Sequence, residues 1–521
     1  MLDHLQERLK KDRMNNNKRI VLNTGVIYIK LIFSALIGLY TSRVILQALG
    51  ADDYGLYSVV GGIVTFLNVI GTTMVSVSNR YIAVELGKGE GGNPNRIFNT
   101  VLVIHLVLAL GLLLIGETLG VFYVNNLLNV QPDKILDARF VLHVSLVTTA
   151  LSIITVPYNG LIVAREKFIF TSVLELSTLI MKLGLVIMLS YSDSNRLRLF
   201  TLIMALVSIV TQIAYQSYCH IKDRDIIKWK LNKCKEDYKS VFGFAWWSLF
   251  GAIAYIGKEQ GAAMIINFFF GTILNAAFGL ATQINRYAMM FTKGLSQAAI
   301  PQIMKSFGAG NIDRSLNLVY AISRISTLIM LVIVIPLCLC MDDILVLWLK
   351  TPPKYTSIFA VFMLINALVS MVGAGFDACI QSTGNVKKNE IYSSLIYLSL
   401  LPAIFIMYKM GMPPYMNVVI LPVLSLGIRA MQIILLKKMT SFEFSTFWKR
   451  SLMPSLHTLL LASVPLIGLR IFIGHTILET IVLTTVAVVW TIVSVILVGM
   501  SKDERKKIIG YIRTIRSKSN E

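Results

Sequence analysis

Apolar stretches long enough to cross a lipid bilayer recur along the chain and are separated by short polar segments. Fourteen of them contain enough residues to span roughly 30 Å of hydrocarbon at about 1.5 Å of helical rise per residue. They cover residues 20–47, 56–78, 97–124, 139–163, 168–190, 198–220, 241–269, 273–299, 316–340, 356–382, 390–408, 415–436, 451–472 and 476–500. This pattern predicts an all-α polytopic membrane protein with about fourteen transmembrane helices.

The seventh and eighth stretches resemble the beginning of the chain. Phe278 to Leu280 matches Tyr54 to Leu56, and Phe307 to Gly310 matches Leu86 to Gly89, at a separation of about 220 residues. These matches indicate two copies of one unit. Because each copy has an even number of helices, both enter the membrane in the same direction. The sequence therefore predicts two six-helix lobes related by a parallel pseudo-two-fold repeat.

The segments outside the two copies complete the predicted organisation. The chain is divided into an amphipathic cytoplasmic N-terminus (1–19), an N-lobe (20–220), a basic cytoplasmic linker (221–240), a C-lobe (241–436), a cytoplasmic loop (437–450), two extra C-terminal helices (451–500) and a basic cytoplasmic tail (501–521). We expect the substrate site to lie between the two lobes.

Composition and charge support the membrane class. Only 15% of the 521 residues are charged and 55% are hydrophobic, whereas soluble domains carry roughly 25% charged residues. The net formal charge of +21 comes from basic residues that collect in alternate loops, as cytoplasmic loops do. We therefore expect both termini in the cytoplasm and anionic membrane lipids, not nucleic acid, as the bulk partner. The five cysteines show no paired extracellular pattern and are expected to be free thiols.

Several cations lie at depths where hydrocarbon is expected. A charge there costs at least roughly 2.5–3.5 kcal/mol, so these side chains should face a protein interior or a water-filled cavity. The candidates for a cationic substrate-binding cavity are Lys30, Arg43, Lys182, Lys258, Arg286 and Lys293. Lys30, Lys258 and Arg286 lie too deep to reach an interface easily. For Arg43 and Lys293, the alternative is a side chain that extends to the nearer headgroups.

The segment from Gly257 to Gly261 is unusual for a membrane span because it contains Lys258 and Glu259 side by side. Adjacent residues on a helix point in different directions. Either the helix opens between the glycines to form a binding site, or one of the two side chains reaches a neighbouring helix. Glu259 and Asp377 are the candidates for titrating or cation-coordinating groups if transport is coupled to H⁺ or Na⁺.

Signals of enzymatic chemistry are weak. His105 and His143 have no acidic or cysteine companion at a spacing suited to metal binding. No phosphate-binding loop, dinucleotide fingerprint or metal-binding helix motif occurs. We therefore expect a transporter rather than an enzyme, with no catalytic residues, no metal site and no cofactor beyond a coupling ion.

The run from Ser42 to Tyr57, SRVILQALGADDYGLY, resembles the polysaccharide exporters of the MATE-like multidrug/oligosaccharidyl-lipid/polysaccharide (MOP) superfamily, of the O-antigen flippase type. The resemblance continues through Asn79-Arg80-Tyr81 and through Glu85 to Gly89. It implies two six-helix lobes around a central cavity, which carry a lipid-linked (undecaprenyl diphosphate) oligosaccharide from the cytoplasmic to the outer leaflet by alternating access.

The same resemblance implies a place in the bacterial cytoplasmic (inner) membrane and a role in O-antigen or in capsular or exopolysaccharide biosynthesis. The expected partners are a lipid-linked anionic oligosaccharide and other glycan-assembly membrane proteins. The diphosphate of such a lipid suits arginine and lysine side chains, which bind phosphate oxygens through charge-assisted hydrogen bonds. This agrees with the cations found within the apolar stretches.

Two alternatives remain open. A cation-coupled multidrug exporter of the same superfamily would share the fold but would be expected to have an acidic cavity, whereas the deep charges here are mostly basic. A membrane glycan polymerase or acyltransferase would usually need a catalytic histidine or acidic pair, or a sizeable outer loop. The outer loops of this chain are short.

Overall fold

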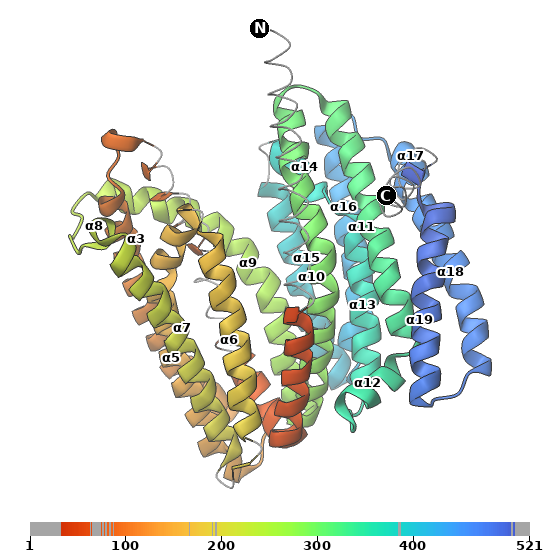
Figure 1. The fold of residues 1–521 in the computed structure, drawn as a ribbon, viewed down its shortest axis with the longest axis horizontal. Coiled ribbons are helices and arrows are strands. Elements are labelled where there is room, and N and C mark those ends of the chain that lie inside the picture. Colours follow the sequence, from red (N-terminus) through yellow and green to blue (C-terminus); the bar gives the residue numbers. More distant parts are fainter. Residues whose placement is uncertain are drawn as a thin grey trace, which may run out of the picture.

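The computed structural model is helical, and the residues it describes include no strand (Figure 1). It describes residues 33–62, 64, 74–75, 78, 81–82, 85–86, 88–165, 167–189, 191–192, 195–383, 387–501 and 504–505, without the side chains of residues 89, 168–169, 243–252, 293–299, 301 and 305. Eleven of the described helical stretches are long and apolar enough to cross a membrane. The predicted all-α polytopic membrane fold is confirmed.

The N-lobe is the bundle that contains α3, α5, α6 and α7 (Figure 1). Its elements are the helical residues 33–62, η1 (Gly89–Gly91), α3 (Pro94–Ile115), the π-helix η2 (Gly116–Gly120), α4 (Val121–Asn126), η3 (Pro132–Lys134), α5 (Ile135–Ala164), α6 (Phe168–Leu189) and α7 (Arg196–Lys222). The first part of residues 33–62 lies against the C-lobe, where Trp348 donates to the Leu39 carbonyl at 2.7 Å and Gln283 to the Gly38 carbonyl at 3.3 Å. The loop predicted over residues 48–55 is helical instead. Gly50 has a φ of +80°, which a continuous right-handed helix does not contain, so two helical segments meet there.

The C-lobe follows the short helix α8 (Arg224–Ile227). It comprises α9 (Lys235–Phe270), α10 (Thr272–Gly308), α11 (Ile312–Leu339), α12 (Met341–Leu349), α13 (Thr356–Val372), α14 (Phe376–Ser382), α15 (Lys387–Lys409) and α16 (Met416–Met439). The single helix predicted over residues 356–382 is therefore two helices. They are divided at Gly373 to Gly375, where Gly375 has a φ of +92° that suits glycine.

The last helices pack against α11 at the edge of the C-lobe (Figure 1). They are α17 (Phe444–Phe447), η4 (Trp448–Leu452), α18 (Met453–Phe472), α19 (Ile477–Ser494) and η5 (Val495–Gly499). At one end of α18, Arg470 pairs with Asp343 of α12 at 2.6 Å. This ion pair ties the added helices to the C-lobe.

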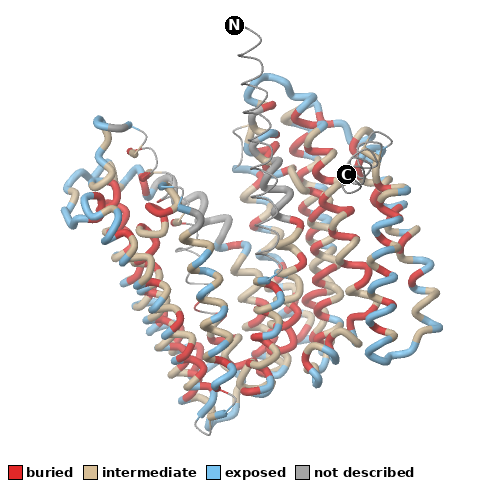
Figure 2. The backbone as a smooth tube through the Cα atoms, viewed as in Figure 1, coloured by how far each residue is buried: buried red, intermediate tan, exposed pale blue. Residues whose placement is uncertain are grey.

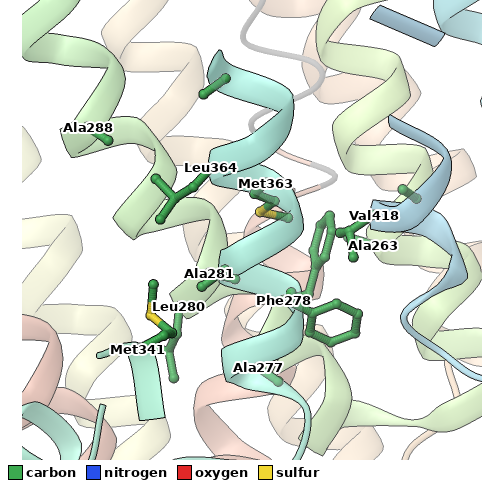
Figure 3. Packing of buried hydrophobic residues seen from close by; sticks show 14 of the residues in the cluster. Ala263, Ala277, Phe278, Leu280, Ala281, Ala288, Met341, Met363, Leu364 and Val418 are labelled. Carbon is green, nitrogen blue, oxygen red and sulfur yellow. The ribbon is translucent and has the colours of Figure 1, made fainter. Parts of the chain in front are cut away.

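Each lobe has its own apolar core. In the C-lobe, small residues on α10, including Ala277 and Ala281, allow close approach to Met363 and Leu364 of α13, and Phe278 fills the space beside them (Figure 3). Buried residues lie mainly on the inner faces of the helices, while apolar side chains are exposed on the outside of the molecule (Figure 2). Exposed apolar surface of this kind is expected where helices face lipid.

The two lobes touch at the end of the molecule that contains Gly50. The backbone N–H of Asn129 donates to the side chain of Asn267 at 2.9 Å, and Thr272 donates to Asp52. Toward the opposite end, where α8 lies, the two bundles spread apart (Figure 1). The lobes are thus joined at one end and separated at the other.

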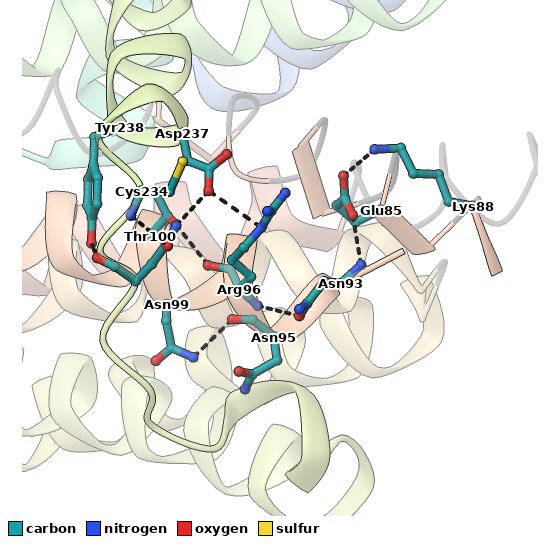
Figure 4. Close-up of polar contacts among 11 residues, drawn as sticks. Glu85, Lys88, Asn93, Asn95, Arg96, Asn99, Thr100, Cys234, Asp237 and Tyr238 are labelled. Atoms are coloured by element: carbon teal, nitrogen blue, oxygen red, sulfur yellow. Dashed lines mark hydrogen bonds and ion pairs between the residues drawn. The ribbon is translucent and has the colours of Figure 1, made fainter. Parts of the chain in front are cut away.

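α9 begins at Lys235, within the segment predicted as a linker. The chain before it is held on α3, because the Asn95 and Asn99 amides donate to backbone carbonyls of that chain. Arg96 of α3 also pairs with Asp237 of α9 at 3.4 Å (Figure 4). The connection between the lobes is therefore docked on the N-lobe, and α9 runs from there into the C-lobe.

Glu85, from the motif that carries the family resemblance, has a structural role beside this connection. It accepts hydrogen bonds from the Asn93 backbone N–H at 2.8 Å and from Lys88 at 2.5 Å (Figure 4). These bonds, the one from Asn93 foremost, hold the pKa of Glu85 below its usual value. The motif thus fixes the turn that leads into α3.

Candidate substrate-binding cavity

A cavity of about 410 Å³ lies between the lobes. Its N-lobe wall is formed by helical residues 33–62, α5 and α7 and is rich in hydroxyl groups, from Tyr57, Ser58, Ser145, Thr148, Thr149, Thr201 and Ser208. Its C-lobe wall is formed by α9 and α10 and carries Glu259, Gln260, Thr282 and Arg286. Glu259 and Arg286 are the charged residues among those that line it.

Arg286 and Glu259 form a loose ion pair. Their closest nitrogen and oxygen atoms are 3.9 Å apart, and the side chains are 73% and 31% exposed. An ion pair with this much exposure contributes at most about 1 kcal/mol to stability. Most of the guanidinium of Arg286 is therefore open to the cavity, where it could bind an anion.

Lys258 points into an adjoining pocket of about 60 Å³, which Glu259 also lines. Its ammonium group lies 4.8 Å from the ring centroid of Tyr255 and 4.3 Å from that of Tyr397. Cation–π contacts of this kind stabilise a charge that has left bulk water. The two pockets place a second cation close to the Glu259 and Arg286 pair.

α9 is continuous through Gly257 to Gly261, so the hypothesis that the helix opens between these glycines is wrong. Both charged side chains instead reach neighbouring helices. Lys258 contacts Tyr397 of α15, and Glu259 contacts Arg286 of α10. An unbroken helix keeps its backbone groups paired, and the polar chemistry is left to side chains.

The remaining predicted cations do not line this cavity in the described part of the chain. Arg43 donates to the Leu347 carbonyl at 3.3 Å, near the end of α12. Lys182 is carried by α6 and does not line the cavity. Lys30 lies outside the described residues, as does the side chain of Lys293 on α10. The structure thus places Lys258 and Arg286 in adjoining pockets that share Glu259, and the binding role of all these cations stays a prediction.

Asp377 lies outside the cavity, in a cluster of amides within the C-lobe. It accepts hydrogen bonds from Asn389 at 3.1 Å and from Gln432 at 2.7 Å. Gln432 in turn accepts a hydrogen bond from Arg429 at 2.6 Å. The role of Asp377 in ion coupling stays a prediction.

No protein-family model matches the chain, and no curated protein matches it. Among solved structures, the lipid II flippase MurJ in its inward closed conformation matches with a TM-score of 0.67 and 13% identity, over 89% of this chain and 97% of that one. An inward-facing multidrug resistance MATE family transporter of the MOP superfamily matches with a TM-score of 0.57 and 13% identity, over 89% of this chain and 97% of that transporter. The chain has the MOP-superfamily fold.

A third solved structure bears on the charge of the cavity. It is a MOP superfamily transporter from Pyrococcus furiosus, described as having a binding pocket of reverse polarity that suggests a different function. It matches with a TM-score of 0.55 and 15% identity, over 79% of this chain and 95% of that one. At such identities the similarity shows the MOP fold alone.

Sequence reasoning missed two features of this MOP-fold chain. His143 does have an acidic partner, because its Nδ1 lies 2.9 Å from Glu117 of η2. The hydroxyl-rich wall of the N-lobe was also missed, since serine and threonine are tolerated in apolar helices and attract little attention there. Their spacing along α5, in steps of three and four residues, was the available signal.

Proposed function

We propose that the protein is a flippase that moves a lipid-linked oligosaccharide, carried on undecaprenyl diphosphate, from the cytoplasmic to the outer leaflet by alternating access. The observation that carries the proposal is the exposure of Arg286, 73% of whose side chain is open in a cavity between two lobes. An arginine held only by a loose pair has donors free for phosphate oxygens. Lys258, in the adjoining pocket, supplies a second positive charge.

An apolar pocket beside the cavity supports a lipid-linked substrate. It has a volume of about 730 Å³ and is formed by helical residues 33–62, α10, α11 and α12, with no charged side chain among its lining residues. Tyr287 lines this pocket, while Arg286, the preceding residue on α10, lines the polar cavity. α10 therefore presents one side to a charged head group and another to a prenyl tail.

The lobes suit alternating access because they are joined at one end and spread apart at the other (Figure 1). The similarity to a lipid II flippase is consistent with a lipid-linked glycan. We place the protein in the bacterial inner membrane, with both termini cytoplasmic, and in O-antigen or other surface polysaccharide biosynthesis beside further glycan-assembly membrane proteins. If transport is coupled to H⁺ or Na⁺, Glu259 is the better-placed acid, because an anion that binds Arg286 would weaken its ion pair.

Transport into vesicles tests the proposal. Purified protein is reconstituted with fluorescently labelled lipid-linked oligosaccharide, and exposure of the label on the far side is measured for the wild type and for Arg286→Gln and Lys258→Gln. Arg314→Gln, an exposed arginine at the start of α11, is the matched control. We expect both cavity variants to slow translocation at least tenfold and the control to match the wild type. Unchanged translocation in both cavity variants would contradict the proposal.

A multidrug exporter is the second candidate, favoured by Glu259, which places one carboxylate in the cavity. The same vesicles loaded with a cationic dye distinguish the two candidates. Dye export that is lost in Glu259→Gln and kept in Arg286→Gln would identify a drug exporter. Glycolipid translocation without dye export would identify the flippase.

A further inference from the structure

A stripe of hydroxyl and amide side chains runs along α5 beyond the cavity between the lobes. Ser145 and Thr148 line that cavity, and Ser152, Thr155 and Asn159 continue in the same steps of three and four residues. Such spacing keeps all five on one face of the helix. From first to last they extend over about 21 Å at about 1.5 Å per residue.

The second part of this stripe lines a separate pocket inside the N-lobe, with a volume of about 400 Å³. α5, α6 and α7 form most of it, and Ser208 of α7 lines both this pocket and the cavity between the lobes. The pocket and the cavity are therefore adjacent, with Ser208 in the wall of both. Among the residues that line the pocket, only two valines lack a hydroxyl or amide group, and none carries a charge.

The polar groups of this pocket keep hydrogen-bonding capacity for a ligand. Thr211 donates to the Val207 carbonyl of its own helix at 2.8 Å, and its oxygen also lies 3.1 Å from the Thr178 hydroxyl. A hydroxyl oxygen has two acceptor positions, so one is left for a ligand. Gln212 is only 7% exposed, and its nitrogen donates to Ser208 at 2.9 Å and to the Thr148 carbonyl at 3.2 Å, while its oxygen accepts no bond from the described residues. The side chain of Asn159 likewise has no hydrogen-bond partner among them.

The lack of charge, the polar lining and the volume of the pocket indicate what kind of ligand it can bind. A charged group would find no counter-charge in the pocket, and an apolar group would leave buried donors and acceptors unpaired, which costs about 1–3 kcal/mol for each. The volume lies within the range of roughly 300–1,000 Å³ that small-molecule sites occupy. A molecule with many neutral hydroxyl groups satisfies both conditions.

We infer that this pocket, called the N-lobe hydroxyl pocket, binds an uncharged sugar unit of the transported glycolipid while the diphosphate lies at Arg286. The inference rests on the proposed function, because it takes its ligand from that substrate. It divides recognition between the lobes: the C-lobe binds the charge of the carrier, and the N-lobe binds sugar hydroxyl groups.

Binding measurements with two probes test the inference. The probes are undecaprenyl diphosphate without sugar and the same lipid carrying a neutral disaccharide, each titrated into the full-length protein in detergent. The test variant is Ser152→Ala with Thr211→Val, which removes two hydroxyl groups with little change of shape. Thr485→Val is the control, since Thr485 is exposed on α19 and bonds only its own helix, at 2.8 Å to Ile481.

We expect the test variant to bind the disaccharide lipid roughly 5- to 30-fold more weakly, as the loss of two hydrogen bonds of about 1 kcal/mol each predicts. Its affinity for the sugar-free lipid should change less than twofold, whereas Arg286→Gln should weaken binding of both probes. Asn159→Ala, with the same expected pattern, replaces the test variant if thermal unfolding shows that the latter is misfolded.

The outcomes separate the two proposals. A wild-type protein that binds neither probe would overturn the proposed function. A wild-type protein that binds both probes equally, or pocket variants that leave the ratio of the two affinities unchanged, would overturn the inference and leave the proposed function standing.

Discussion

Removing Glu259 tests whether Arg286 serves the substrate or the fold. In Glu259→Gln the guanidinium loses its carboxylate partner and nothing else, because glutamine is close in size and shape to glutamate. The geometry predicts a small effect on stability. The pair is 3.9 Å apart and Arg286 is 73% exposed, so its loss should lower the free energy of unfolding by no more than about 1 kcal/mol. In a dry interior, an unpaired arginine would cost roughly 3–5 kcal/mol.

The affinity for an anionic lipid should change more than the stability does, and in a different direction for each variant. Charge-assisted hydrogen bonds contribute about 1.5–3 kcal/mol, so Arg286→Gln should weaken binding of undecaprenyl diphosphate roughly 10- to 150-fold. Glu259→Gln should bind this anion at least as tightly as the wild type, because a competing negative charge has gone. The variants would thus change affinity in different directions while both remain folded.

The assay combines denaturant unfolding in detergent micelles with titration of undecaprenyl diphosphate, on both single variants and the double variant. The double-mutant cycle isolates the coupling between the two side chains, which should be no more than about 1 kcal/mol in stability. A loss of 3 kcal/mol or more in Glu259→Gln, with unchanged affinity in Arg286→Gln, would refute the reasoning. The pair would then be a buried structural element.

Three further predictions concern the fold. Asn95→Ala should speed tryptic cleavage of the chain between α8 and α9, because the amide of Asn95 donates to backbone carbonyls at residues 226 and 228 at 2.8 and 2.7 Å. The control is Asn126→Ala, since the amide of Asn126 bonds only its own helix. Equal cleavage rates in the two variants would contradict the prediction. Gly55→Ala should destabilise the protein by about 1–3 kcal/mol, measured by denaturant unfolding, since its Cβ would overlap a backbone carbonyl at the start of α10, whereas Gly111→Ala meets nothing and should be neutral. In intact cells, a membrane-impermeant maleimide should label the exposed Cys234 only after the membrane is opened; labelling of unopened cells would place this segment outside the cytoplasm.

The residues that carry the family resemblance have identifiable structural roles. Glu85 belongs to the motif on which the resemblance rests, and the structure shows it fixing the turn before α3. Gly55, from the same region, lies against the backbone at the start of α10. Glycine is required there because no side chain fits between the helices. Such residues identify the fold because they shape it, and they carry no information on the substrate.

The sequence by itself determined the membrane class, the helical fold and the presence of cations at depth, because apolar length and charge depth are local properties of a chain. The tertiary structure decided where these cations lie, with Arg286 in the cavity between the lobes and Lys258 in the pocket that adjoins it. Lys258 and Glu259 are neighbours in sequence, yet the rotation of α9 sends one to Tyr397 and the other to Arg286. The same packing unites the hydroxyl groups of α5 and α7, since helix rotation and lobe contact depend on residues far apart along the chain.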